Sequence, residues 1–117
     1  MGLDQAHLMI VAGEASGDFH AANLVRALRG RASGLRFSGI GGQEMRSADV
    51  KTYYDIDRLA AVGLFEVFGR LPWYRRVFLD FVACVEREKP RALILVDFPD
   101  FNLRVAQKAK RMGVPII

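Results

Sequence analysis

Short runs of consecutive apolar residues alternate with amphipathic stretches along the chain. The two clearest runs cover residues 8–12 and 92–96, and each is followed at once by small or polar residues. Such unbroken runs are typical of strands that are buried on both faces of a parallel sheet. Weaker runs predict further strands at residues 35–40 and 50–54, and residues 114–117 begin another.

The intervening segments have helical periodicity. After the first strand, apolar residues recur at three- and four-residue spacing on one helix face: Ala21, Leu24, Val25 and Leu28. Asp18 stands where a cap for this helix is expected. The pattern also predicts a short helix from Gln43, a mostly helical segment over residues 59–85 and a last helix over residues 101–112. This alternation predicts a three-layer, Rossmann-like α/β fold with a parallel sheet and right-handed crossovers.

Composition narrows the class of protein. The 117 residues amount to one small domain, and 51% hydrophobic with 26% charged residues is a globular composition. The net charge of +4 suits anionic partners such as phosphates or an acidic membrane face. The basic residues are scattered and carry no recognised nucleic-acid motif, which argues against nucleic acid as the partner.

Cysteine usage and hydropathy add two further expectations. Cys84 is the only cysteine, so the chain holds neither an internal disulfide nor a zinc cluster, and its apolar neighbours predict a core position. No apolar run approaches the roughly 18 residues of a membrane-spanning helix. We therefore expect a cytoplasmic protein whose contact with a membrane is peripheral.

Three loops follow the carboxyl ends of predicted strands, the edge where open parallel sheets bind ligands. In the first, Gly13 and Gly17 allow a tight turn, and Glu14, Ser16 and Asp18 add polar groups beside free helix N–H groups. The loop matches neither the dinucleotide fingerprint nor the P-loop. An ordinary strand-to-helix turn with a helix cap is the alternative.

The second and third loops offer different chemistry. The second is rich in glycine, which lets a ligand or another backbone approach closely, although a flexible turn explains it equally well: Gly39, Gly41 and Gly42. In the third, Asp97 directly follows an apolar strand. We expect it to be partly shielded from water, which would raise the carboxylate pKa and suit a general base, with a structural hydrogen bond as the alternative. Asp100 is predicted to cap the following helix, and Asn102 adds an amide.

Residues 61–82 combine apolar, aromatic and arginine side chains, the composition of an interfacial membrane helix. The residues that mark this character are Leu64, Phe65, Val67, Phe68, Trp73, Arg75 and Arg76. The alternative is a core helix that covers the sheet, and both interpretations can hold for different faces.

Four motifs in order carry a family resemblance. They are Val-Ala-Gly-Glu-Ala-Ser-Gly-Asp at 11–18, Gly-Ile-Gly-Gly at 39–42, Ala-Val-Gly-Leu-Phe-Glu-Val at 61–67 and Val-Asp-Phe-Pro-Asp-Phe-Asn at 96–102. Together they resemble the lipid A disaccharide synthases. The resemblance implies an inverting, GT-B-like glycosyltransferase of two Rossmann-like domains at the cytoplasmic face of the inner membrane. It further implies that UDP-2,3-diacylglucosamine and 2,3-diacylglucosamine 1-phosphate give a β-1,6-linked disaccharide and UDP, with no metal or other cofactor.

The resemblance also assigns roles to residues. Asp97 is the first candidate for the base and Glu14 the second. The residues expected to shape the substrate site are Gly13, Ser16, Gly17, Asp18, Gly41, Gly42, Asp100 and Asn102. The apolar segment would receive acyl chains or dock on an anionic bilayer.

The family continues well past residue 117. We therefore expect residues 1–117 to be part of the N-terminal, acceptor-side domain, without the domain that binds the nucleotide sugar. Such a piece would be inactive alone, and its exposed sheet edge would be prone to self-association.

Two other functions remain as alternatives. A Rossmann-like enzyme that binds a nucleotide cofactor is disfavoured because the G-x-G-x-x-G fingerprint and an acidic ribose partner after the second strand are both missing. For a non-catalytic module that binds a membrane or a partner, the expected truncation counts in favour, and the loop that carries Asp97 and Asp100 counts against. Binding to vesicles without sugar transfer would support this second alternative.

Overall fold

Parallel strands form the central sheet, and helices flank it. The structure, a computed structural model, describes residues 6–56 and 72–117, with side chains described from residue 75 onward in the second range. Within these residues the strands are β1 (His7–Ala12), β2 (Arg36–Gly41), β3 (Lys51–Asp55) and β4 (Ala92–Val96). Their order in the sheet is β3-β2-β1-β4. The four strands predicted from the apolar runs are thus confirmed to within a residue at each end.

The chain extends the sheet again after its last helix. Leu93 pairs with Ile116 in a parallel bridge. The Leu93 N–H donates to the Pro115 carbonyl at 2.8 Å, and the Ile117 N–H donates to the Leu93 carbonyl at 2.9 Å. Residues 114–117 therefore begin a further strand beside β4, as the sequence predicted.

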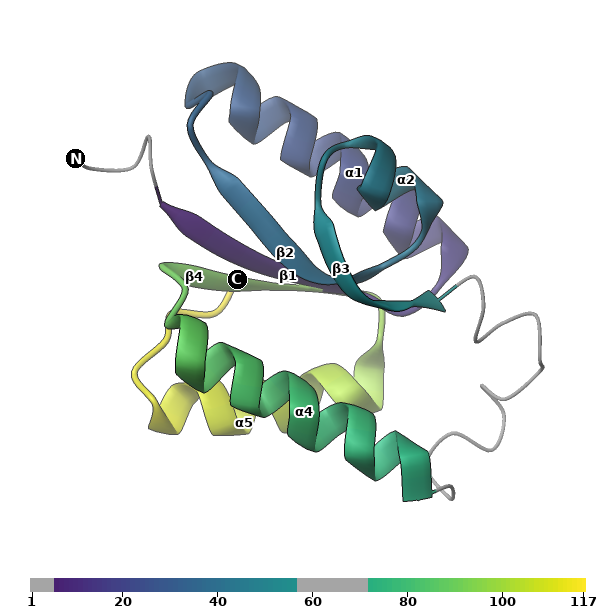
Figure 1. The fold of residues 1–117 in the computed structure, drawn as a ribbon, viewed down its shortest axis with the longest axis vertical. Coiled ribbons are helices and arrows are strands. Elements are labelled where there is room, and N and C mark those ends of the chain that lie inside the picture. The colour runs from purple at the N-terminus through teal and green to yellow at the C-terminus, as the bar shows by residue number, and fades with distance from the viewer. Residues whose placement is uncertain (1–5, 57–71) are drawn as a thin grey trace.

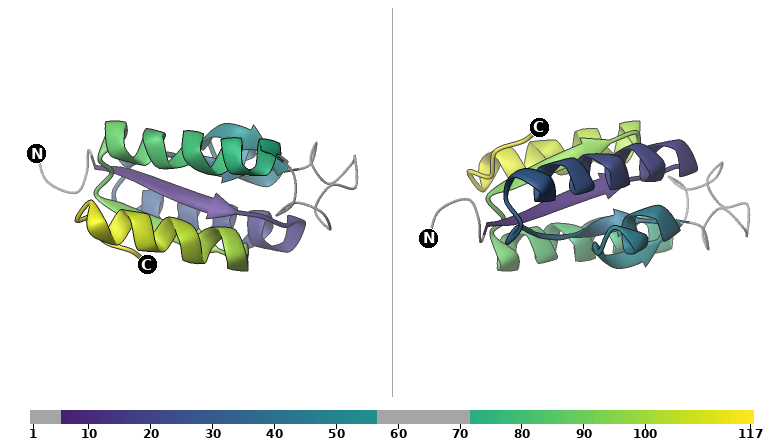
Figure 2. Two further views of the ribbon diagram at one scale, coloured as in Figure 1. Left: turned by 90° about the horizontal axis from the view of Figure 1, so that it is seen from below. Right: turned by 90° about the horizontal axis from the view of Figure 1, so that it is seen from above.

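Helices cover both faces of the sheet (Figures 1 and 2). The helices are α1 (Ala15–Arg31), α2 (Gln43–Ser47), α4 (Pro72–Glu88) and α5 (Pro99–Arg111). Helices α1 and α2 lie on one side, while α4 and α5 lie on the other. This arrangement is the predicted three-layer, Rossmann-like parallel fold.

Alternation along β1 explains why both faces are covered. Met9 and Val11 belong to the core cluster under α4 and α5, whereas Ile10 and Ala12 belong to the cluster under α1 and α2. All four side chains are fully buried. A strand with two buried faces needs an unbroken apolar run, because successive side chains point to opposite sides.

The starts of three helices differ from the prediction or are only partly described by the structure. The predicted segment 59–85 is described only as α4 from Pro72, and residues 57–71 lie outside the described residues. The last helix begins at Pro99 rather than at 101, because proline is well suited to the first helical turn. Helix α1 begins at Ala15, so the prediction that Asp18 caps it is wrong.

Cys84 is half-buried at the margin of the core.

Candidate functional site

The loops after β1 and β4 meet at the point where the strand order reverses. Strand β1 pairs with β2 on one side and with β4 on the other. The chain leaves β1 for α1 on one face of the sheet and leaves β4 for α5 on the opposite face (Figure 2). Open α/β sheets bind ligands in the crevice that forms at such a switch point.

Ser16 and Asp97 lie together at this edge, although they are far apart in sequence. The Ser16 hydroxyl donates a hydrogen bond to Asp97 Oδ2 at 3.2 Å. A Cβ added to Gly17 would lie 3.1 Å from the Asp97 Cβ, so glycine there lets the aspartate approach the helix. The juxtaposition of Ser16, Gly17 and Asp97 was expected only from the fold, since nothing local in the sequence pairs them.

The backbone turns sharply at Asp97. Its φ is +50°, a left-handed conformation that non-glycine residues seldom adopt and that often marks functional sites. Strand β4 ends at Val96, and the Asp97 side chain is exposed. The prediction that Asp97 is partly shielded is wrong, because the residue has already left the buried strand. Its candidacy as a base therefore rests on its position and not on burial.

The loop after β4 also packs on the loop after β1. A Cβ on Gly13 would overlap the Phe98 ring, so the ring lies directly on the Gly13 backbone. Phe98 in turn stacks on Phe101, with ring centroids 4.7 Å apart and an interplanar angle of 11°. Glu14 is exposed beside this contact and makes no side-chain cap bond. Gly13 is thus required by packing, while the Glu14 carboxylate faces solvent.

Asp18 lies in the first loop, and its side chain contacts the second, glycine-rich loop and the start of α2. Its side chain is 3% exposed, and its carboxylate accepts backbone N–H groups of Gly42, Glu44 and Met45 at the start of α2. Gly41 lies under Met45, whose sulfur a Cβ on Gly41 would overlap. The fold therefore brings the glycine loop and Asp18 together, and their polar and packing groups contact each other.

The first turn of α5 holds the remaining predicted site residues. Asp100 is exposed and pairs with Arg104 at 3.2 Å. The N-cap is Phe98, so the predicted capping role of Asp100 is wrong, because the helix starts two residues earlier than that role requires. Asn102 is 8% exposed, and its side-chain Oδ1 is buried without a hydrogen-bond partner among the described residues. A buried amide oxygen of this kind calls for a donor.

Helix α4 has an inner and an outer face. Val77, Phe81 and Val85 face the core, which confirms the core-helix interpretation for this face. Arg75 and Arg76 are exposed, and Leu79 is exposed as well. The predicted membrane residues Leu64, Phe65, Val67 and Phe68, and the side chain of Trp73, lie outside the described residues.

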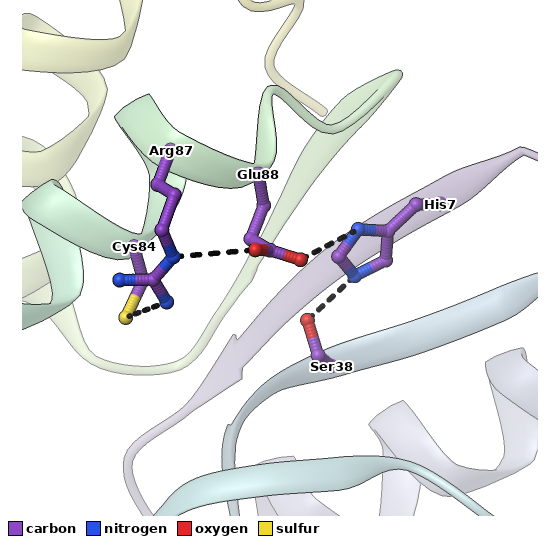
Figure 3. A network of polar contacts seen from close by, with 5 residues as sticks. All are labelled: His7, Ser38, Cys84, Arg87 and Glu88. Atoms are coloured by element: carbon purple, nitrogen blue, oxygen red, sulfur yellow. Dashed lines mark hydrogen bonds and ion pairs between the residues drawn. The ribbon is translucent and has the colours of Figure 1, made fainter.

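A second polar cluster, which the sequence did not reveal, lies at the opposite edge of the sheet (Figure 3). His7 Nε2 is 2.7 Å from the Ser38 hydroxyl, and His7 Nδ1 is 3.9 Å from a Glu88 carboxylate oxygen. Burial, and then the charge of Arg36, lower the pKa of His7. The cluster ties β1 to β2 and to the end of α4. The sequence signals that could have indicated this cluster are His7 and Ser38, which are polar residues in otherwise largely apolar strands.

Two wider features bear on function. Across residues 6–56 and 72–117, no three His, Cys, Asp or Glu side chains gather closely enough to hold a metal ion. In the same part of the chain, every helix is too short or too polar to cross a bilayer.

The strand order and the flanking helices define a Rossmann-like α/β domain. A model of the lipid-A-disaccharide synthetase family matches residues 8–117, and the chain belongs to this family. It is 47% identical over 108 residues to the lipid-A-disaccharide synthase of Nitrosococcus oceani, covering 92% of this chain and 28% of that protein. It is 43% identical to the Myxococcus xanthus synthase over 93% of this chain and 28% of that protein. It is 45% identical to synthase 1 of Legionella pneumophila strain Philadelphia 1, over 96% of this chain and 29% of that protein. The chain therefore spans less than a third of the length of these relatives.

Proposed function

We propose that this chain forms the acceptor side of a glycosyltransferase of lipid A biosynthesis. The enzyme joins UDP-2,3-diacylglucosamine to 2,3-diacylglucosamine 1-phosphate and releases UDP. The observation that carries this proposal is the contact between Ser16 and Asp97 at the switch point, in a member of the lipid-A-disaccharide synthetase family. The nucleotide part of the donor would be held by the remainder of the protein, which the relatives possess.

The chemistry follows from inversion at the anomeric carbon. The acceptor hydroxyl attacks that carbon, the new β-1,6 C–O bond forms, and the bond to UDP breaks with its electron pair leaving on UDP. Asp97 takes the hydroxyl proton. Because Ser16 donates to Oδ2, the other carboxylate oxygen of Asp97 is the one offered to the acceptor. Glu14, exposed on the neighbouring loop, is the second candidate for the base.

Other groups at this edge would bind rather than react. The buried Oδ1 of Asn102, which has no hydrogen-bond partner among residues 6–56 and 72–117, suits a hydroxyl or amide donor. Asp100 is exposed in the first turn of α5, and Gly13, Gly17 and Gly41 give the loops their close packing. Gly42 forms the N-cap of α2. No metal or other cofactor enters this proposal.

The membrane supplies both lipid substrates in this proposal. The outer face of α4 carries Arg75 and Arg76 beside the exposed Leu79, a combination suited to an anionic bilayer surface. The enzyme would work as a peripheral protein at the cytoplasmic face of the inner membrane. The sheet edge at residues 114–117 remains a predicted site of self-association.

Sugar transfer by an extended protein tests this function. The extended protein is this chain continued at its carboxyl end by the remainder of the Nitrosococcus oceani relative. Both lipid substrates are supplied in detergent micelles, and disaccharide and UDP are measured. We expect product from the extended protein, none from the 117-residue chain, and a loss on the order of 10²–10⁴-fold in kcat for Asp97→Asn.

Asp49→Asn is the matched control for this substitution. Asp49 is an exposed aspartate with a φ of +65°, so it resembles Asp97 in conformation and exposure. Its substitution should leave kcat within about two-fold, since surface changes of this kind are nearly neutral. No disaccharide from a folded extended protein would refute the proposed function. Vesicle binding without transfer would then favour a non-catalytic module.

A further inference from the structure

Helix α2 brings no capping side chain of its own. It has five residues, and its N-cap is Gly42, which has no side chain to offer. A helix of this length is unstable by itself in water. The N–H groups of its first turn also need acceptors from elsewhere.

Asp18 supplies these acceptors from α1. One carboxylate oxygen accepts the Gly42 N–H at 2.8 Å and the Met45 N–H at 3.0 Å, and the other accepts the Glu44 N–H at 3.0 Å. Hydrogen bonds to an ionised carboxylate are stronger than neutral ones, and a negative charge is favourable at a helix N-terminus. The carboxylate therefore does for α2 what a capping side chain would do.

This contact decides what the glycine loop can bind. The start of a helix is a ready anion site, because its N–H groups point outward. Here a carboxylate of the chain itself fills that position and is 3% exposed. A substrate phosphate cannot use the same N–H groups while Asp18 holds them. The loop through Gly41 and Gly42 therefore contributes shape and not charge recognition.

The same residue lies beside the contact that carries the proposed chemistry. Asp18 is in the first turn of α1, and its N–H donates to the Glu14 carbonyl at 2.9 Å. Two residues earlier, Ser16 donates to Asp97 at 3.2 Å. The intervening Gly17 is the surface on which Asp97 packs. The first turn of α1 is thus held between α2 on one side and the loop after β4 on the other.

Arg29 holds the far ends of the same two helices. Its guanidinium donates to the carbonyls of Ala48 and Asp49, just after α2, and to the carbonyl of Leu35, just before β2. Helices α1 and α2 lie side by side between these two contacts (Figures 1 and 2). Asp18 and Arg29 therefore fix α2 at opposite ends, but only Asp18 adjoins Ser16 and Asp97.

We propose that Asp18 is a positioning residue. By fastening the first turn of α1 to α2, it sets the place of the Ser16 hydroxyl and, through it, of the Asp97 carboxylate. This inference rests on the proposed function, in which Asp97 takes the acceptor proton. Asp18 acts through Ser16 and Asp97 and does not itself contact substrate.

Kinetics of the extended protein test this role. A displacement of about 1 Å at a reacting group can cost roughly 100-fold in rate, so we expect Asp18→Ala to lower kcat by about that factor. KM for both substrates should change less than about three-fold, because binding groups stay in place. Asp18→Asn keeps an amide oxygen for Gly42 and Met45 and loses the acceptor for Glu44, so it should recover part of the rate.

Arg29→Ala is the matched control, because it loosens the other end of α2. We expect it to lower the thermal midpoint as much as Asp18→Ala while kcat stays within about three-fold, measured well below either midpoint. Asp18→Asn combined with Ser16→Ala should show clear non-additivity in kcat, as residues that act through one contact do. Equal kcat losses for Arg29→Ala and Asp18→Ala, additive effects with Ser16, or a raised KM with unchanged kcat would each overturn the inference.

An NMR measurement on the 117-residue chain separates this inference from the proposed function. Asp18→Asn should shift the amide signals of Gly42 and Glu44 and also those of Ser16 and Asp97. Signals of Ser16 and Asp97 that do not move would overturn the positioning role even in an active enzyme. Absence of transfer by the unsubstituted extended protein, with those shifts present, would refute the function and leave the structural coupling in place.

Discussion

The Tyr54 hydroxyl donates a hydrogen bond to Asp80 Oδ2 at 2.9 Å, and this contact joins the edge strand β3 to α4. The two residues are 26 positions apart, so the bond crosses the whole connection between the strand and the helix. Burial, followed by the hydrogen bond and charge of Asp80, raises the pKa of Tyr54 to about 12. The hydrogen bond between β3 and α4 therefore forms only while the Tyr54 phenol is protonated.

Tyr54→Phe should lower the free energy of unfolding by about 1 kcal/mol at pH 7, the usual worth of one hydrogen bond. The folded pKa lies above the ordinary value of 10, so this stabilisation is complete below pH 10 and is lost as the pH rises toward 12. Denaturant unfolding of both proteins at pH 7 and across this range measures it. Tyr53→Phe, on the same strand, is the control and should have little effect. A difference that persists undiminished at pH 12 would contradict the account.

The environment of His7 predicts that the free energy of unfolding falls at acid pH. The pKa of His7 is lowered from 6.5, first by burial and then by Arg36, with Glu88 opposing and Lys51 adding to the effect. A lowered folded pKa means that the unfolded chain binds more protons. The stabilisation is therefore present above pH 6.5 and is lost as the pH falls through the folded pKa.

His7→Gln should remove part of this acid sensitivity, because glutamine can still bond Ser38 but does not titrate. Unfolding curves at pH 7.5, 6.5 and 5.5 compare the two proteins. His20→Gln changes an exposed histidine on α1 and should keep the pH dependence of the unsubstituted chain. A parallel fall in stability for His7→Gln and the unsubstituted chain would show that other groups cause the loss.

The sequence predicted the sheet well because burial on both faces leaves a local record. Met9 to Ala12 must all be apolar when helices cover both sides, and that run is visible without any knowledge of the fold. The edge that carries Asp97 also followed from the strand order, since carboxyl ends of parallel strands lie together.

Other features leave no local record. An aspartate three residues before an apolar stretch looks like a cap for its own helix, yet Asp18 bonds Gly42, 24 residues away. The pattern cannot show this, because the acceptor and donors meet only when α1 and α2 pack. Likewise, an aspartate after a buried strand looks shielded, but the left-handed turn at Asp97 places it in solvent.

Gly13→Ala should destabilise the chain by about 1–3 kcal/mol, the usual cost of an added methyl in a packed site. The Phe98 ring occupies the space that the methyl would need. Gly30→Ala is the matched control, because no atom lies within 4 Å of the added Cβ and the residue is helical. That change should stabilise by about 0.5–1 kcal/mol. Equal effects of the two substitutions in thermal unfolding would argue that the Phe98 contact does not constrain Gly13.

The proposed contact with an anionic membrane can be tested on the outer face of α4. Arg75 and Arg76 are exposed near Leu79, and each basic residue at such a surface contributes about 1 kcal/mol. Neutralising both with Arg75→Gln and Arg76→Gln should weaken binding to vesicles rich in phosphatidylglycerol by about 30-fold, with less effect at high salt.

The matched control removes the same charge from the opposite layer. Arg26 and Arg31 are exposed on α1, across the sheet from α4, and Arg26→Gln with Arg31→Gln should change vesicle affinity far less. Co-sedimentation with anionic and with neutral vesicles separates charge from apolar contact. A similar loss for both pairs would mean that net charge, and not the face of α4, brings the chain to the membrane.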